Sequence, residues 1–154
     1  MDAPDLKPAT RSSAHDGARH AVQRLKALAH WRVPGNRSTD RVLVVEDEPG
    51  ALEAAVAVFE KSGYAVLSAS CGAEAMELMT LTRDIQLLFA DVLMPGMDGA
   101  TLGREARKLL PDIRVVLVSG FPGHAMDAHG GEVGEFPFLM KPFTMAEVKL
   151  LLAR

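Results

Sequence analysis

The amino-acid sequence predicts an α/β protein built on an open parallel sheet with helices on both faces. Five short apolar runs, rich in Val, Leu and Ile, alternate with longer stretches whose apolar residues recur at helical spacing. The runs are continuously apolar, which is typical of strands that helices cover on both sides. Polar side chains follow several of these runs, at the edge where such sheets carry their chemistry.

The predicted strands alternate with helices along the chain, as a series of βαβ units requires. Each apolar run is followed by a turn or by the start of a helix. We expect the five strands at Val42–Val45, Ala65–Ala69, Ile85–Ala90, Ile113–Val118 and Phe136–Met140.

Residues with known end preferences mark where the helices begin and end. Pro49 stands where a helix needs no amide donor, and Gly63 is a candidate C-terminal cap. Thr144 followed by Glu147 forms a capping-box pattern. We expect helices at Pro49–Lys61, at Gly72–Leu81, from Asp98-Gly99 to the residue before Pro111, near His124–His129, and from Thr144 onward.

The charge balance changes near residue 40. Residues 1–40 carry seven Lys and Arg against four Asp and Glu, a net charge of +3, whereas residues 41–154 carry ten against sixteen, a net charge of −6. We expect a domain at 41–154 and an N-terminal extension or linker at 1–40, with an amphipathic helix over 14–31. An acidic domain is unlike the basic surface of a nucleic-acid-binding protein.

The sequence shows no sign of export or of membrane insertion. No apolar run approaches the roughly 18 residues of a membrane helix, and the N-terminus lacks the apolar core of a secretory signal. Cys71, the only cysteine, cannot form an internal disulfide, and a free thiol suits a reducing compartment. We therefore expect a cytoplasmic protein with neither nucleic acid nor a membrane among its partners.

Charged and hydroxyl side chains are predicted to gather at the carboxyl edge of the sheet. The first strand is followed by Glu46 and Asp47, the third by Asp91, the fourth by Ser119 and the fifth by Lys141. Crowded carboxylates repel one another unless a proton or a cation relieves the repulsion. Oxygen ligands without sulfur or imidazole suit Mg²⁺ or Mn²⁺. A carboxylate beside such an ion can attack phosphorus while a lysine and a hydroxyl hold the other oxygens, so the set predicts phosphoryl transfer to an aspartate.

Four segments carry a resemblance to a known family. They are VLVVEDEPG, LLFADVLMPGMDG, VVLVSGF and FLMKPF, in this order within residues 41–154. Together they resemble the successive strand-end motifs of response-regulator receiver domains of two-component systems. The resemblance implies a flavodoxin-like five-stranded parallel sheet in the order 2-1-3-4-5. It also implies a phosphoacceptor that assists its own phosphorylation and dephosphorylation, with a histidine kinase or a histidine phosphotransfer protein as its partner.

Position by position, the resemblance assigns Asp91 as the phosphoacceptor. It implies that the side chains of Glu46, Asp47 and Asp91 hold Mg²⁺ or Mn²⁺ together with the backbone carbonyl of Leu93. Lys141 would pair with the phosphoryl oxygens.

The resemblance also assigns a conformational switch. Ser119 stands where the family has a Thr or Ser that turns toward the phosphoryl group, and Phe138 falls at the aromatic switch position. Because Phe lacks the hydroxyl of Tyr, hydrophobic repacking must suffice there. Pro142 matches a proline whose preceding peptide bond is often cis in the family.

Simpler interpretations exist for the same residues. The acidic turn at 46–48 could serve only as a helix N-terminus, where carboxylates suit the helix dipole. Ser119 could satisfy a backbone group, Lys141 could be a solvated surface residue, and Phe138 could belong to the core. Asp98 is expected to cap a helix. We assign no chemistry to Cys71 or to the histidines, whose spacing does not suggest a metal site.

Other function classes make different demands on the sequence. An aspartate-nucleophile phosphohydrolase would need a second acid two residues after the nucleophile, where this chain has Leu93. A flavodoxin-like cofactor-binding protein would need a Gly- or Ser-rich phosphate loop after the first strand, where this chain has acids. A pseudo-receiver, an interaction module that keeps the fold without the chemistry, would lose an acid or the lysine, and none is lost.

The last predicted helix reaches to within a residue or two of residue 154. If the chain is complete, we expect its output to be a partner protein, onward phosphotransfer or self-association as a homodimer. A receiver from a hybrid histidine kinase would give the same sequence, with residues 1–40 as the preceding linker.

Overall fold

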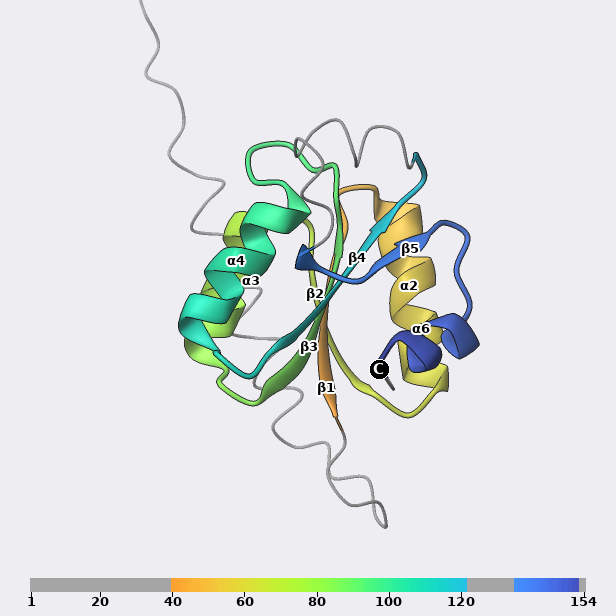
Figure 1. Cartoon of the computed structure of the whole chain (residues 1–154), viewed down its shortest axis with the longest axis horizontal. Helices are drawn as coiled ribbons and strands as arrows, with labels where there is room; N and C mark the ends of the chain where they lie inside the picture. The colour runs from red at the N-terminus through yellow and green to blue at the C-terminus, as the bar shows by residue number, and fades with distance from the viewer. Residues whose placement is uncertain (1–39, 122–134, 153–154) are drawn as a thin grey trace, which may run out of the picture.

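A computed structural model of the chain describes residues 40–121 and 135–152. The strands form one parallel sheet in the order β2-β1-β3-β4-β5 (Figure 1). They are β1 (Arg41–Val45), β2 (Ala65–Ala69), β3 (Ile85–Asp91), β4 (Arg114–Ser119) and β5 (Phe138–Met140). The predicted flavodoxin-like sheet and its strand order are confirmed.

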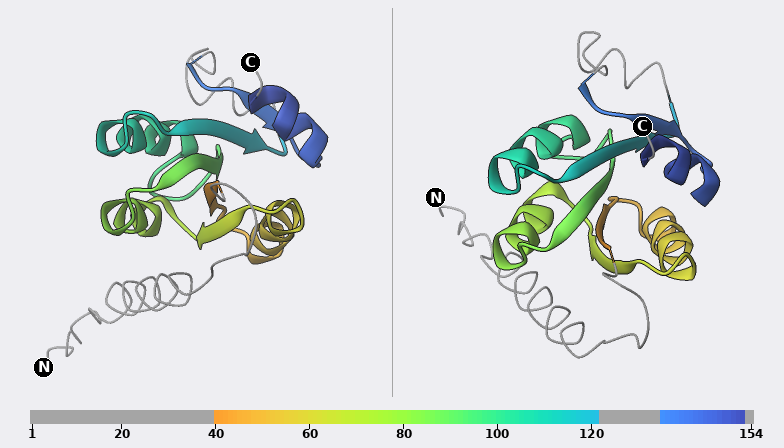
Figure 2. Two further views of the ribbon diagram at one scale, coloured as in Figure 1. Left: turned by 90° about the horizontal axis from the view of Figure 1, so that it is seen from below. Right: turned by 60° about the horizontal axis from the view of Figure 1, so that its bottom comes forward.

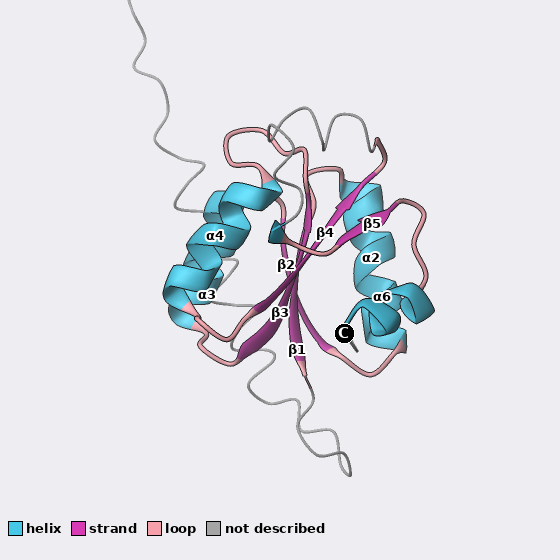
Figure 3. Ribbon diagram, viewed as in Figure 1, coloured by secondary structure: helices cyan, strands magenta, loops and turns pink. Residues whose placement is uncertain are grey.

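Helices cover both faces of the sheet, as predicted. α3 and α4 lie on one face, and α2 and α6 lie on the other (Figures 2 and 3). The helices of the described residues are α2 (Pro49–Lys61), α3 (Gly72–Leu81), α4 (Gly99–Leu109) and α6 (Met145–Leu152). Within these same ranges, every helix is too short or too polar to traverse a bilayer. The helix expected near His124–His129 and residues 1–39 of the extension lie outside the described residues.

Two apolar cores form because neighbouring side chains of a strand point to opposite faces of the sheet. Leu43 and Leu88 pack in the core beneath α3 and α4. Val44 and Phe89, one residue further along the same strands, pack in the core beneath α2 and α6. Phe59 of α2 meets Phe89 edge to face, with ring centroids 5.0 Å apart. Burial of each such side chain contributes about 1.5–3 kcal/mol, so both faces anchor the strand ends that form the site.

Side-chain caps fix the starts of three helices. Glu48 accepts two backbone amides of the first turn of α2 at 3.0 and 2.5 Å, and these bonds lower the pKa of its carboxyl. Asp98 accepts one from the first turn of α4 at 2.8 Å. Thr144 and Glu147 form the predicted capping box before α6. The helix-terminus interpretation of the acidic turn therefore holds for Glu48.

Five strand boundaries differ from the prediction. β1 begins at Arg41 rather than Val42, and β4 begins at Arg114 rather than Ile113. β3 includes Asp91 and β4 includes Ser119, because the parallel ladder pairs each of them with the neighbouring strand. β5 begins at Phe138 rather than Phe136. Phe136 is buried instead against Gly103 of α4, where an added Cβ would lie 3.0 Å from the phenyl ring. Packing between the strand approach and the helix thus decides where β5 starts.

Candidate functional site

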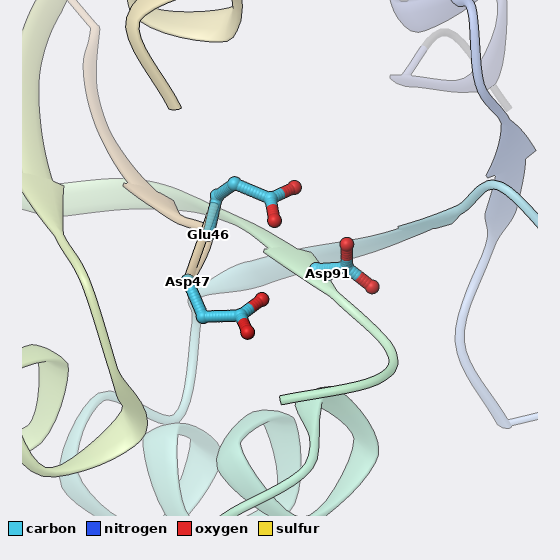
Figure 4. A group of neighbouring side chains, drawn as sticks. All are labelled: Glu46, Asp47 and Asp91. Carbon is cyan, nitrogen blue, oxygen red and sulfur yellow. The ribbon is translucent and has the colours of Figure 1, made fainter. Parts of the chain in front are cut away.

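The candidate site lies at the carboxyl edge of the sheet, where β1 and β3 end side by side. Glu46 and Asp47 directly follow β1, and Asp91 is the last residue of β3. Carboxylate oxygens of the three residues lie within 4.8 Å of one another. Figure 4 shows the three side chains grouped at these two strand ends. The structure therefore brings together the acids that the sequence placed at one edge.

The three acids differ in their exposure. Glu46 is 5% and Asp91 7% exposed, whereas Asp47 is exposed. Glu46 continues the ladder beyond β1, since its backbone amide donates to the carbonyl of Ala69 at the end of β2. The cluster consequently has two buried carboxylates and one that opens to solvent.

Lys141 supplies the positive charge of the site. Its Nζ lies 2.5 Å from Asp91 Oδ2 and also donates to Glu46 Oε2. The residue directly follows β5, and its backbone amide donates to the carbonyl of Ser119 at 2.9 Å. The Lys141-Pro142 peptide bond is cis, as the resemblance implied. Lys141 is therefore an ion-paired residue of the site and not a solvated surface lysine.

Burial and charge act in opposite directions on the site's ionisable groups. Burial raises the pKa of the Glu46 carboxyl; the hydrogen bond from Lys141 lowers it, the proximity of Asp91 raises it, and the net shift is upward. Burial lowers the pKa of the Lys141 ammonium, but its bonds to Asp91 and Glu46 outweigh this and raise it overall. The lysine therefore stays charged at neutral pH, and it pairs with two of the three carboxylates.

Two contacts that the sequence analysis missed hold Asp91 in place. The backbone amide of Leu93 donates to Asp91 Oδ1 at 2.9 Å. Gly99 opens α4 so close to β3 that an added Cβ would lie 2.2 Å from the carbonyl oxygen of Asp91. A backbone amide leaves no trace in a residue pattern, but the glycine after Asp98 was a usable signal of close approach.

The two predicted switch residues belong to β4 and β5, with Ser119 at the end of β4 and Phe138 at the start of β5. Ser119 is buried at the end of β4, and its Oγ accepts the backbone amide of Phe121 at 3.2 Å. Phe121 itself is 67% exposed. Phe138 is half-buried and packs against the core beneath α3 and α4. The structure therefore shows a local role for the Ser119 hydroxyl and a partly core role for Phe138.

The donor set fits a hard divalent cation. Carboxylate oxygens suit Mg²⁺, which keeps several waters and takes only one or two protein carboxylates. The exposed Asp47 gives such an ion and its waters access to the cluster. Burial and the neighbouring Asp91 raise the pKa of Glu46 despite Lys141, so ionised Glu46 carries an electrostatic cost that Lys141 does not fully offset. A bound cation would relieve this cost.

Comparison with known proteins agrees with the fold. The sequence matches the family model of the response regulator receiver domain over residues 42–153. The chain belongs to this family, the receiver domains of two-component systems.

Two curated relatives come from Brucella abortus (strain 2308). The chain is 40% identical to the sensor kinase CckA over 108 residues. This match covers 70% of this chain but only 11% of CckA. The chain is 32% identical over 108 residues to the response regulator receiver protein CpdR, covering 70% of this chain and 89% of CpdR. The matched region thus corresponds to a small part of one relative and to nearly all of the other.

Solved structures show the same architecture. The receiver domain of the hybrid histidine kinase CckA is 33% identical, with a TM-score of 0.58, covering 73% of this chain and 95% of that one. The response regulator TrrA of Thermotoga maritima, solved in complex with Mg²⁺ and BeF, is 25% identical, with a TM-score of 0.61, covering 74% and 96%.

Proposed function

We propose that this chain is a working phosphoacceptor switch in which Asp91 receives a phosphoryl group from a histidine kinase or a histidine phosphotransfer protein. The observation that carries the proposal is the pairing of Lys141 Nζ with Asp91 Oδ2 at 2.5 Å, inside a cluster of three carboxylates. A lysine, a nucleophilic carboxylate and two further acids are the parts that phosphoryl transfer requires. A pseudo-receiver would have no need to keep them together.

Glu46, Asp47 and Asp91 would hold Mg²⁺, or Mn²⁺, with the backbone carbonyl of Leu93 as a further ligand. When bound, the ion supplies positive charge that screens the incoming phosphoryl oxygens from the carboxylates. The solved structure of TrrA with Mg²⁺ and BeF supports this assignment by likeness.

The protein's own residues orient the acceptor and balance its charge. A carboxylate oxygen of Asp91 attacks phosphorus, an O–P bond forms, and the donor's N–P or O–P bond breaks with its electron pair leaving on the donor. The amide of Leu93 fixes the carboxylate through Oδ1, and Lys141 is placed to pair with the transferred phosphoryl oxygens. The same groups would assist the later attack of water, which returns Asp91 and releases phosphate.

Phosphorylation would act on Ser119. In the described state its hydroxyl bonds the backbone of Phe121, so turning toward a phosphoryl group on Asp91 requires that local bond to break. The loop after β4 and the half-buried Phe138 would then rearrange, which gives the phosphorylated protein a different surface.

The direct test is labelling with acetyl phosphate and Mg²⁺, followed by intact-mass and peptide analysis. We expect one phosphoryl group, located on Asp91, and no label after a chelator removes the metal. Asp91→Asn should abolish labelling. Asp112→Asn, an equivalent change at an exposed position after α4, should leave it intact.

The chemistry of the label gives a second check. An acyl phosphate survives acid and is lost in alkali, whereas a phosphoserine is stable in mild alkali. Wild-type labelling of Asp91→Asn, or a label that resists alkali, would show that Asp91 is not the acceptor.

A further inference from the structure

An apolar cavity lies beside the candidate site and takes no part in the proposed chemistry. It has a volume of about 380 Å³ and opens between α2 and the segment 141–143, on the sheet face that α2 and α6 cover. Its apolar lining includes Ala51, Ala54, Val58, Phe89, Val118 and Phe143. Glu46 and Lys141 line it as well, so one end of the cavity is continuous with the ionised site.

The cavity exists because α2 presents small side chains toward the segment 141–143. Ala51, Ala54 and Val58 recur at helical spacing along one side of α2, and all three line the cavity together with Phe143. Ala54 is exposed, while Ala51 and Val58 are half-buried, so this side of the helix is open to solvent. Apolar surface of this kind suits an apolar side chain supplied from another segment.

We propose that residues 14–31 of the same chain dock on this cavity through their apolar stripe. In sequence, Val22, Leu25 and Leu28 recur at helical spacing in that segment, and Leu25 is at the centre. Residues 14–31 also carry Arg19, Arg24 and Lys26 against a single acid, Asp16.

The two surfaces are complementary in charge as well as in polarity. Among the described residues, the ionised end of the cavity adjoins a cluster of three carboxylates, two of which pair with Lys141. An apolar stripe accompanied by basic residues therefore matches an apolar cavity that ends in an acidic cluster. An acidic or purely apolar segment would lack one half of this match.

The connecting chain is long enough for the contact. Residues 32–39 can span about 26–29 Å when extended. The described chain begins at Asp40, and the cavity lining includes Val44 and Val45 of β1, about 13–17 Å further along the strand. Because the segment is tethered, its effective concentration at the cavity is of the millimolar order, which favours it over a second copy at micromolar concentration.

Docking would cover the wall that Lys141 and Pro142 form beside Asp91. A protein phosphodonor would then be hindered more than a small one such as acetyl phosphate. This consequence rests on the proposed function, whereas the docking itself does not. The contact is therefore tested without phosphorylation.

The test is disulfide trapping in the full chain, with Cys71→Ser removing the native thiol. Leu25→Cys is combined with Ala54→Cys, and formation of the intramolecular disulfide is followed by intact mass under mild oxidation at micromolar protein. A disulfide requires Cβ atoms about 3.5–4.5 Å apart, so it reports close contact. We expect the bond to form at least about fivefold faster than in the matched pair Leu25→Cys with Glu77→Cys. Glu77 is exposed on α3, which covers the other face of the sheet.

Two other outcomes of the trapping experiment would overturn the proposal. Equal rates for the two pairs would show that the segment does not prefer the cavity, and disulfide-linked dimers would assign the cavity to a second copy. A second measurement uses hydrogen exchange of the full chain. Leu25→Asp should speed exchange in Ala51–Val58 and in 141–143 without changing it in α3, and an unchanged pattern would also exclude docking.

Discussion

Lys141 Nζ lies 2.5 Å from Asp91 Oδ2, although the two residues are 50 positions apart in the chain. The same ammonium bonds Glu46 from the end of the first strand. A single cation thus joins the ends of β1, β3 and β5. Its removal should affect both the stability and the chemistry of the site.

Replacement of Lys141 by Met should destabilise the metal-free protein. The change leaves Glu46 and Asp91 buried without a cation, and breaking a buried pair costs about 3–5 kcal/mol. Because the lysine side chain is 27% exposed, we expect a smaller loss of roughly 1–3 kcal/mol, measured by urea unfolding in a chelator. Lys108→Met removes an exposed pair with Glu105 and should cost less than about 0.5 kcal/mol. Equal losses of unfolding free energy in Lys141→Met and Lys108→Met would contradict the role of Lys141.

Mg²⁺ should raise the melting temperature, because an ion that binds the folded cluster stabilises the folded state. At one hundred times the dissociation constant the gain is about 2.7 kcal/mol. Asp47→Ala should remove most of this gain and, by relieving repulsion, should leave the metal-free protein as stable as before or more so. Asp112→Ala, far from the cluster in sequence and exposed, is the control that should keep the full Mg²⁺ response. An undiminished response in Asp47→Ala would place the ion elsewhere.

The raised pKa of Glu46 predicts a pH dependence with a definite sign. A carboxyl whose folded pKa lies above its ordinary value of 4.5 contributes most below that value, and the contribution is lost as pH rises through the folded pKa. The unfolding free energy of the wild type minus that of Glu46→Gln should therefore fall as pH rises above 4.5, in a chelator. Taking the difference cancels the carboxyl groups that do not interact with Glu46. A difference that grows with pH would mean that Lys141 outweighs burial at this site.

Beryllofluoride, a mimic of the acyl phosphate, should speed amide exchange at Phe121. In the described state that amide donates to Ser119 Oγ, and the proposed turn of Ser119 toward Asp91 breaks the bond. Ser119→Ala should show fast exchange at Phe121 with or without the mimic, because it lacks the acceptor. We also expect changes across 120–134 and around Phe138. Changes confined to the neighbourhood of Asp91 would contradict a switch.

Gly99→Ala should be strongly destabilising. The new Cβ would lie 2.2 Å from the backbone carbonyl oxygen of Asp91, so β3 or α4 must shift, at a cost of about 1–3 kcal/mol or more. The shift should also slow phosphorylation of Asp91. Gly50→Ala, in the first turn of α2, meets only the flexible Glu48 carboxylate at 3.3 Å and should change stability by less than about 1 kcal/mol. Chemical denaturation of both variants tests this pair.

The sequence alone determined the sheet, most of its element boundaries and the identity of the clustered side chains. Short continuous apolar runs between helical stretches predict strands covered on both faces, and end signals such as Pro49 and Gly63 are local. The predicted bounds Pro49–Lys61 and Gly72–Leu81 match α2 and α3. Because parallel strands end at one edge, residues that follow them had to meet there, and they do.

Tertiary structure alone decided how these residues divide their roles. Glu46 is buried and ion-paired while Asp47 faces solvent and Glu48 caps a helix, although the three are consecutive. Contacts between distant segments also placed Phe136 against Gly103 and α4 against the carbonyl of Asp91, and packing among the described residues leaves a cavity beside α2. The sequence pattern of a strand or helix shows which face a residue occupies. Its burial, its ion pairs and the cavities beside it depend on how far the side chains of the neighbouring segments reach.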